Sequence, residues 1–170
     1  ITNVIPETCF GDCDGSATVN SSSGVNPFTY LWNPTNQSTQ TASNLCVGTY
    51  VATVTDNLNC VDSISTNITG PTVLTVLASE NSPIACNSNC DGVAIATPLW
   101  CNPNYTYLWN DPLNQTTDSA KFLCIGNYQV NIVDGNGCTS QAVATINEPT
   151  QLNAAVTSKG DLVCFQDLPL

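Results

Sequence analysis

The chain has 170 residues, including ten Cys, and contains neither His nor Met. Thirteen Asp and Glu residues stand against only two Lys and Arg residues, which gives a formal net charge of −11. This balance argues against nucleic-acid or anionic-membrane binding, because both need clustered Lys and Arg side chains.

The rest of the composition is that of a folded protein from an oxidising compartment. Apolar residues make up 42% of the chain, which is too many for an acidic disordered tail. Ten Cys indicate disulfide bonds. No apolar run approaches the roughly 20 residues of a membrane span. Residues 1–4 lack the basic start and apolar segment of a signal peptide, so an exported protein would contain this chain as a mature internal piece.

The first predicted elements are short β-strands. Residues 16–20 alternate small or apolar with polar side chains, and residues 28–32 form an aromatic strand. Residues 49–55 alternate with a period of two, and residues 61–69 form a last strand. Asp-Gly, Asn-Pro and similar turn formers separate the strands. The same four elements recur at residues 93–97, 105–109, 127–133 and 139–147.

The recurrence has a nearly constant offset, which predicts a repeat protein. The segment 9–15 returns as 86–92, 77 positions later (86 − 9), and after one inserted residue Cys46 returns as Cys124, 78 positions later (124 − 46). Cys164 lies 78 positions after Cys86 (164 − 86), so a third copy begins near the end of the chain.

The repeat predicts the domain organisation. We expect one repeat over residues 1–72, a second over 73–150, and the start of a third, truncated repeat over 151–170. Many short strands at this spacing favour an all-β fold of small sandwiches. Each unit of about 78 residues buries a modest core, so covalent crosslinks matter for its stability. The short junctions between units favour a semi-rigid rod.

Several motifs resemble those of a known family. Residues 13–19 read Cys-Asp-Gly-Ser-Ala-Thr-Val, residues 27–33 read Pro-Phe-Thr-Tyr-Leu-Trp-Asn, and residues 45–50 read Leu-Cys-Val-Gly-Thr-Tyr. Their order and spacing are similar to the SprB-type repeat of very large surface adhesins of gliding Bacteroidetes. The resemblance implies tandem Ig-like β-sandwiches, export by the type IX secretion route, and an extracellular place on the cell surface.

The cysteines occur in register in the two repeats. They are Cys9, Cys13, Cys46 and Cys60 in the first, and Cys86, Cys90, Cys124 and Cys138 in the second. Four Cys allow three pairings. The resemblance implies the pairs Cys9–Cys60, Cys13–Cys46, Cys86–Cys138 and Cys90–Cys124, each stabilising by roughly 4 kcal/mol. Zinc is the alternative, but the Cys-x3-Cys spacing differs from the usual knuckle and the chain has no His.

Two further cysteines fall outside this pattern. We expect Cys164 to belong to the third repeat, with its partners beyond the end of the given sequence, although Leu168 stands at the position that matches Cys13. Cys101 has no counterpart in the first repeat, where Gly24 stands at its position. It could link to a neighbouring chain or to Cys164, or remain a free thiol or bond within its own turn. We favour a free thiol or a bond within its own turn.

Several other residues suggest a binding role, but each also has a structural explanation. We expect Trp32 and Trp109 in the cores, and Trp100 on a loop where it could contact a partner. Asp residues near the turns could hold calcium between domains, although Asp-Gly and Asp-Asn are also ordinary turn formers. These residues are Asp12, Asp14, Asp56, Asp91 and Asp134.

Two serines are candidate modification sites. Ser63 and Ser119 each follow an Asp and precede an apolar residue, a pattern that resembles the O-glycosylation sites of exported Bacteroidetes proteins.

The predicted function is structural, in the stalk of a large adhesin linked to gliding motility or surface attachment. Its partners would be the neighbouring repeats of the same chain. The alternatives are a filament or sheath subunit that self-associates, favoured by Cys101 and Trp100, and a carbohydrate-binding module that binds surface polysaccharide through Trp100 and Tyr105. We expect no enzymatic activity, because the common general base is missing and no nucleophile, base and orienting group occur together. We expect no cofactor other than the calcium considered above.

Overall fold

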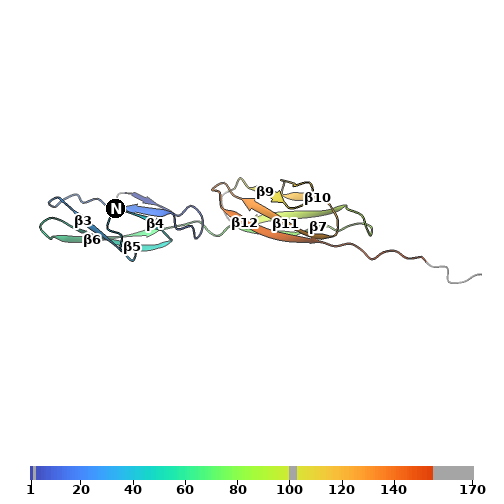
Figure 1. Ribbon diagram of the computed structural model, residues 1–170, viewed down its shortest axis with the longest axis horizontal. Helices are drawn as coiled ribbons and strands as arrows, with labels where there is room; N and C mark the ends of the chain where they lie inside the picture. The colour runs from blue at the N-terminus through green and yellow to red at the C-terminus, as the bar shows by residue number, and fades with distance from the viewer. Residues whose placement is uncertain (2, 100–102, 155–170) are drawn as a thin grey trace, which may run out of the picture.

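The structure, a computed structural model, describes residues 1, 3–99 and 103–154, and it forms two lobes placed end to end (Figure 1). These residues contain twelve strands and no helix, and therefore no helix that could cross a membrane. The strands of the first lobe are β1 (Asn3–Ile5), β2 (Gly15–Thr18), β3 (Thr29–Asn33), β4 (Thr41–Leu45), β5 (Gly48–Thr55) and β6 (Val61–Ile68). Those of the second are β7 (Thr75–Ser82), β8 (Gly92–Leu99), β9 (Thr106–Trp109), β10 (Ser119–Leu123), β11 (Gly126–Val133) and β12 (Thr139–Ile146).

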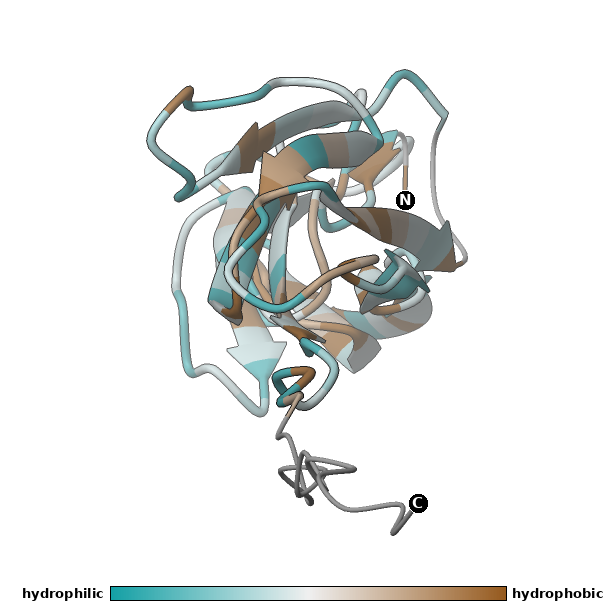
Figure 2. Cartoon of the chain, turned by 90° about the vertical axis from the view of Figure 1, so that its right-hand side faces the viewer, coloured by the Kyte–Doolittle hydropathy of each residue, from teal (hydrophilic) through white to brown (hydrophobic). Residues whose placement is uncertain are grey.

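Both lobes have the same topology. The first contains the antiparallel sheets β1-β2-β4 and β3-β5-β6, and the second contains β7-β8-β10 and β9-β11-β12. Each strand of the first lobe therefore has its counterpart six strands later. Figure 2, which looks along the long axis, shows hydrophobic and hydrophilic residues alternating along the strands. The predicted fold class, tandem Ig-like sandwiches, is confirmed.

Each lobe has a core of its own around one tryptophan. Trp32 and Trp109 are both fully buried, and each belongs to a separate cluster of buried apolar side chains. Their indole N–H groups donate to the carbonyl oxygens of Thr39 and Thr117, both at 3.0 Å. The expectation that these residues lie in the cores is correct. Each fold buries the indole ring and keeps its N–H hydrogen bond, which explains why the two residues have the same surroundings.

Four of the twelve strands are not among the eight predicted from the sequence: β1 and β7, which open the two lobes, and β4 and β10. β4 and its counterpart β10 each contain a residue with a left-handed backbone, Asn44 (φ 54°) and Phe122 (φ 58°). In β10 the pairing with β8 shifts between Lys121 and Leu123, as expected of a β-bulge. The bulge turns Phe122 outward, 73% exposed, and so breaks the alternation by which strands are recognised.

Replacing Trp109 with Ala tests the central role of the buried indole. We expect Trp109→Ala to lower the free energy of unfolding of the second lobe by about 3–5 kcal/mol, because a large cavity remains. The adjacent Leu108 is 48% exposed, so Leu108→Ala is a matched control with an expected loss below about 1 kcal/mol. Denaturant titration followed by circular dichroism measures both, and equal losses would contradict this assignment of the core.

Candidate functional site at the joint between the repeats

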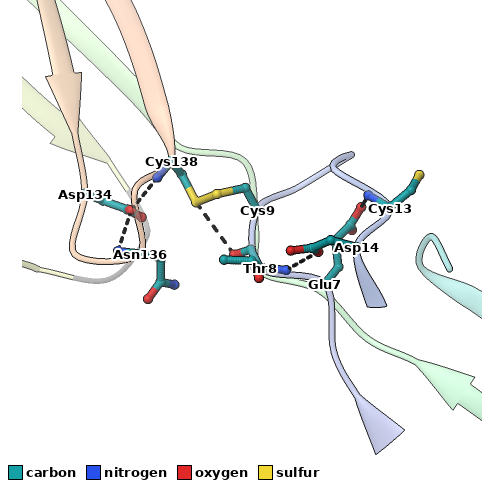
Figure 3. The surroundings of a disulfide bond; sticks show 8 residues. All are labelled: Glu7, Thr8, Cys9, Cys13, Asp14, Asp134, Asn136 and Cys138. Carbon is teal, nitrogen blue, oxygen red and sulfur yellow. Dashed lines mark hydrogen bonds between the residues drawn. A yellow bond between two sulfur atoms is a disulfide. The ribbon is translucent and has the colours of Figure 1, made fainter. Parts of the chain in front are cut away.

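A disulfide bond crosses from one lobe to the other. Cys9, in the loop between β1 and β2, is bonded to Cys138, which ends the turn between β11 and β12 (Figure 3). The two Cα atoms lie 5.5 Å apart, and the bond spans 129 positions of sequence. Together with the linker at residues 69–74, it gives the lobes a second covalent connection.

This bond corrects two of the pairings that the resemblance implied. Cys9–Cys60 and Cys86–Cys138 do not form, and Cys60 and Cys86 are exposed thiols. The Glu7 N–H donates to the Thr69 carbonyl oxygen at 2.9 Å, so the Cys9 loop lies at the end of β6, whereas Cys60 immediately precedes the start of that strand.

The length of the strand explains the correction. The eight residues of β6 span about 26 Å, while a disulfide requires Cα atoms within roughly 7 Å. In the second lobe the Ile84 N–H donates to the Asn147 carbonyl oxygen at 3.3 Å, just beyond the end of β12, and Cys138 immediately precedes the start of that strand. Cys86 and Cys138 therefore lie at opposite ends of their sandwich too.

The other two bonds lie within the repeats. Cys13 is bonded to Cys46, and Cys90 to Cys124, the pairs that the resemblance implies. Each bond ties the loop before β2 or β8 to the turn that follows β4 or β10. The same turn is held by a tyrosine. The Tyr50 hydroxyl donates to the Cys46 carbonyl oxygen at 3.0 Å, and its counterpart in the second lobe makes the same bond to Cys124 at 3.1 Å.

Carboxylates fix the loop that presents Cys9. The Thr8 N–H donates to Asp14 Oδ1 at 2.8 Å. Hydrogen bonds donated by Thr8, from its side-chain hydroxyl first and then from its backbone N–H, lower the pKa of Asp14. The Cys13 N–H donates to Oε1 of the buried Glu7 at 2.6 Å. These bonds close the loop on both sides of Cys9 and fix its position.

A second carboxylate fixes the turn that presents Cys138. Asp134 Oδ1 accepts hydrogen bonds from the backbone N–H groups of Asn136 and Cys138, both at 2.9 Å. Gly137 has φ 91°, a conformation that favours glycine. The Cys138 sulfur lies 3.6 Å from the Thr8 carbonyl oxygen (Figure 3). Because a disulfide sulfur carries no hydrogen, we interpret this approach as a packing contact.

Two hollows flank the joint. One, of about 310 Å³, is bounded by Phe10, the linker residue Val73 and the disulfide itself. The other, of about 440 Å³, lies between Pro6, Pro71 and Asn136. These hollows leave open space on either side of the disulfide and the linker.

Four of the five aspartates named as calcium candidates accept backbone hydrogen bonds within their own loops and turns, and the fifth, Asp12, is exposed. Asp56 and Asp134 accept backbone N–H groups of their own turns, and Asp91 accepts the Ala85 N–H at 3.1 Å. Within residues 1, 3–99 and 103–154, no group of three or more potential metal-ligating carboxylate, thiol or imidazole side chains comes together. Calcium binding stays a prediction.

The remaining predicted site residues are dispersed. Ser63 is exposed on β6, and Ser119 is half-buried at the start of β10, so their glycosylation stays a prediction for which Ser63 is the more accessible. Tyr105, a candidate for sugar contact, is partly buried against the core of the second lobe. Trp100, Cys101 and Cys164 lie outside the described residues.

Stability should fall in acid because of the turn carboxylates. Backbone hydrogen bonds, from Cys60 first and then Val25, lower the pKa of Asp56 below its ordinary value of 3.8. A carboxylate with a lowered folded-state pKa stabilises fully above the unfolded-state pKa, and the contribution is lost as the pH falls through the folded-state pKa. We therefore expect a lower urea midpoint at pH 3 than at pH 6, and a smaller difference in Asp56→Asn. Asp12 is exposed, so Asp12→Asn is the control. If both variants reduce the difference in urea midpoint between pH 3 and pH 6 equally, the stabilising role assigned to Asp56 is contradicted.

Removing the bond between the lobes should loosen the joint without unfolding either lobe. We expect the double variant Cys9→Ser with Cys138→Ser to keep its circular dichroism spectrum, because the two cores are separate. Its distribution of interatomic distances in small-angle X-ray scattering should broaden. The pair Cys13→Ser with Cys46→Ser, which removes a bond within one lobe, is the control. An unchanged distribution in the first variant would show that packing alone fixes the joint.

Comparison with known proteins supports the resemblance over part of the chain. Residues 1–37 match the family profile of the SprB repeat, so the resemblance is confirmed for that stretch, which includes Cys9, Cys13 and Trp32. Comparison with curated protein sequences finds no match.

Among solved structures, the chain is similar to the C-terminal 282-residue fragment of intimin, in complex with the intimin-binding domain of the translocated intimin receptor. The TM-score is 0.42 and the sequence identity 12%, over 86% of this chain and 64% of that fragment. The chain thus spans less than two thirds of that fragment. The duplicated sandwich and the family match together describe a repeat protein whose first copy is similar to the SprB repeat.

Proposed function

We propose that this chain is a segment of the stalk of a large cell-surface adhesin. The observation that carries the proposal is the joint, at which two copies of one sandwich are placed end to end and crosslinked by Cys9–Cys138. A stalk needs units that add length in one direction and resist folding back at the junctions. A short linker and a disulfide at the same junction meet that need.

The chemistry of the chain fits an extracellular place. Disulfide bonds persist where the surroundings are oxidising, and three are present among the described residues. The match to the SprB repeat supports a protein of the bacterial cell surface. By the same likeness, we propose export by the type IX route and a part in gliding motility or surface attachment. The role is structural and non-enzymatic, and contact with polysaccharide would belong to a distal part of the same protein.

A filament or sheath subunit is the second candidate. The exposed thiols of Cys60 and Cys86 favour it, because thiols on different chains could join them into a polymer. The two candidates differ in what is crosslinked: neighbouring repeats of one long chain in a stalk, or separate chains in a filament.

Labelling of intact cells tests the stalk. Antibodies raised against the 170-residue chain should label the surface of the organism that produces it, and brief protease treatment should remove the label. After extraction without a reducing agent, the labelled species should run as one long polypeptide that reduction does not break into shorter chains. Label that is reached only after cell lysis would contradict a surface stalk, and a disulfide-dependent ladder of short chains would favour the filament.

A further inference from the structure

The two exposed thiols lie at the outer ends of the two lobes. Cys60 precedes the start of β6, whereas the joint with the second lobe is at the end of that strand. Cys86 follows β7 and lies near the end of β12, whereas the joint cysteine Cys138 precedes the start of β12. The described pair of repeats therefore has one bonded junction in the middle and one thiol at each end.

The turn that holds Cys60 has the same hydrogen bonds as the turn that holds Cys138. In the outer turn, Asp56 Oδ1 accepts the N–H groups of Leu58 at 2.8 Å and Cys60 at 2.9 Å. The Asp56 N–H donates to the Cys60 carbonyl oxygen at 3.0 Å, and at the joint the Asp134 N–H donates to the Cys138 carbonyl oxygen at 2.9 Å. Cys60 is thus held as a joint cysteine is held.

The loop that holds Cys86 likewise matches the loop that holds Cys9. The N–H three residues further on donates to the cysteine carbonyl oxygen in both, from Asp12 at 3.1 Å and from Asn89 at 3.0 Å. The Ala85 N–H donates to Asp91, as that of Thr8 donates to Asp14. The Cys90–Cys124 bond then anchors the loop as its counterpart does in the first lobe.

The equivalent cysteines differ in solvent exposure, as expected where a neighbouring repeat is missing. Cys138, covered by the other lobe, is 9% exposed, whereas its equivalent Cys60 is an exposed thiol. Cys9 is half-buried against the core of the second lobe, whereas its equivalent Cys86 is exposed. The difference follows from the presence of a second repeat on one side only.

We propose that Cys60 and Cys86 are the open ends of a continuous series of disulfide bonds, one across every joint of a longer array. Cys86 would bond to the Cys60 equivalent of the repeat that follows, and Cys60 to the Cys9 equivalent of the repeat that precedes. Each bond forms when the two thiols lose two protons and two electrons to the disulfide of a thiol oxidant, which leaves as a dithiol. Bonds within one sandwich would instead have to span the length of β6 or β12.

A tandem duplicate of the chain recreates one missing joint. Residue 1 has the repeat position of residues 78 and 156 (9 − 1 = 86 − 78 = 164 − 156), so residues 1–155 followed by a second copy of residues 1–170 keep the register. Cys101→Ser in both copies, and Cys164→Ser in the second copy, which alone contains that residue, leave only the cysteines of the proposed series and the two bonds within repeats in each copy. The same two substitutions in the single chain provide the reference.

Thiol counting on the oxidised, dilute monomer separates the outcomes. The single chain should have two free thiols, Cys60 and Cys86. The duplicate should also have two, because the first copy's Cys86 and the second copy's Cys60 become bonded, and a crosslinked peptide containing both should appear in the mass spectrum. Four free thiols in the duplicate would overturn the proposal. None, with Cys9–Cys60 and Cys86–Cys138 peptides, would overturn it and the observed joint together.

A matched variant guards against a failure to fold. Cys60→Ser in the second copy alone should raise the count from two to three, while the Cys9–Cys138 and Cys13–Cys46 peptides persist as evidence of folding. Cys60→Ser in the first copy alone should lower it from two to one, because that thiol lies at the open end. Identical counts in the two variants would contradict the proposed direction of the series. The stalk itself is judged separately by the cell-surface labelling, which does not depend on this count.

Discussion

The arrangement of this molecule depends on the mismatch between the length of a strand and the reach of a disulfide. Residues at opposite ends of an eight-residue strand are about 24 Å apart, and sulfur atoms cannot bridge that distance. The first and fourth cysteines of a repeat lie at opposite ends of the sandwich, so they cannot form a disulfide bond with each other. Bonding becomes possible only where the end of one repeat meets the start of the next, as Cys9 meets Cys138.

The cysteines reach this position because polar groups fix their loops. The carboxylates of Glu7 and Asp14 close the loop around Cys9, and Asp134 closes the turn before Cys138. A thiol held in a set direction loses little further conformational freedom when it bonds, which favours one partner over others. The sparse charge of the chain is thus used largely inside its own turns, where Asp side chains satisfy backbone N–H groups that no strand pairs.

The sequence was sufficient to predict the repeated sandwich but not the joint. Period-two strands, the recurring Trp and the 77- to 78-residue offset all reflect local preferences and a repeated core, which a single sequence displays directly. The bonds within repeats followed from the resemblance. The joint did not, because assigning each cysteine a partner within its repeat assumed that a repeat is a closed unit. The signal was present in the placement of Cys60 immediately before a long strand. Strands β4 and β10 were missed for a local reason, since left-handed residues at Asn44 and Phe122 interrupt the alternation.

The Cys9–Cys138 bond also changes how the chain would carry tension. A pulling force applied between the two termini of the described region enters through the first nine residues, crosses the sulfur–sulfur bond and leaves after β12. The 129 positions between the bonded residues would supply about 440 Å of contour if fully extended, yet they lie off the loaded path. While the bond is oxidised, unfolding of either sandwich therefore does not add this length to the chain under force. A reducing agent would release it, and the chain would extend much further under the same force.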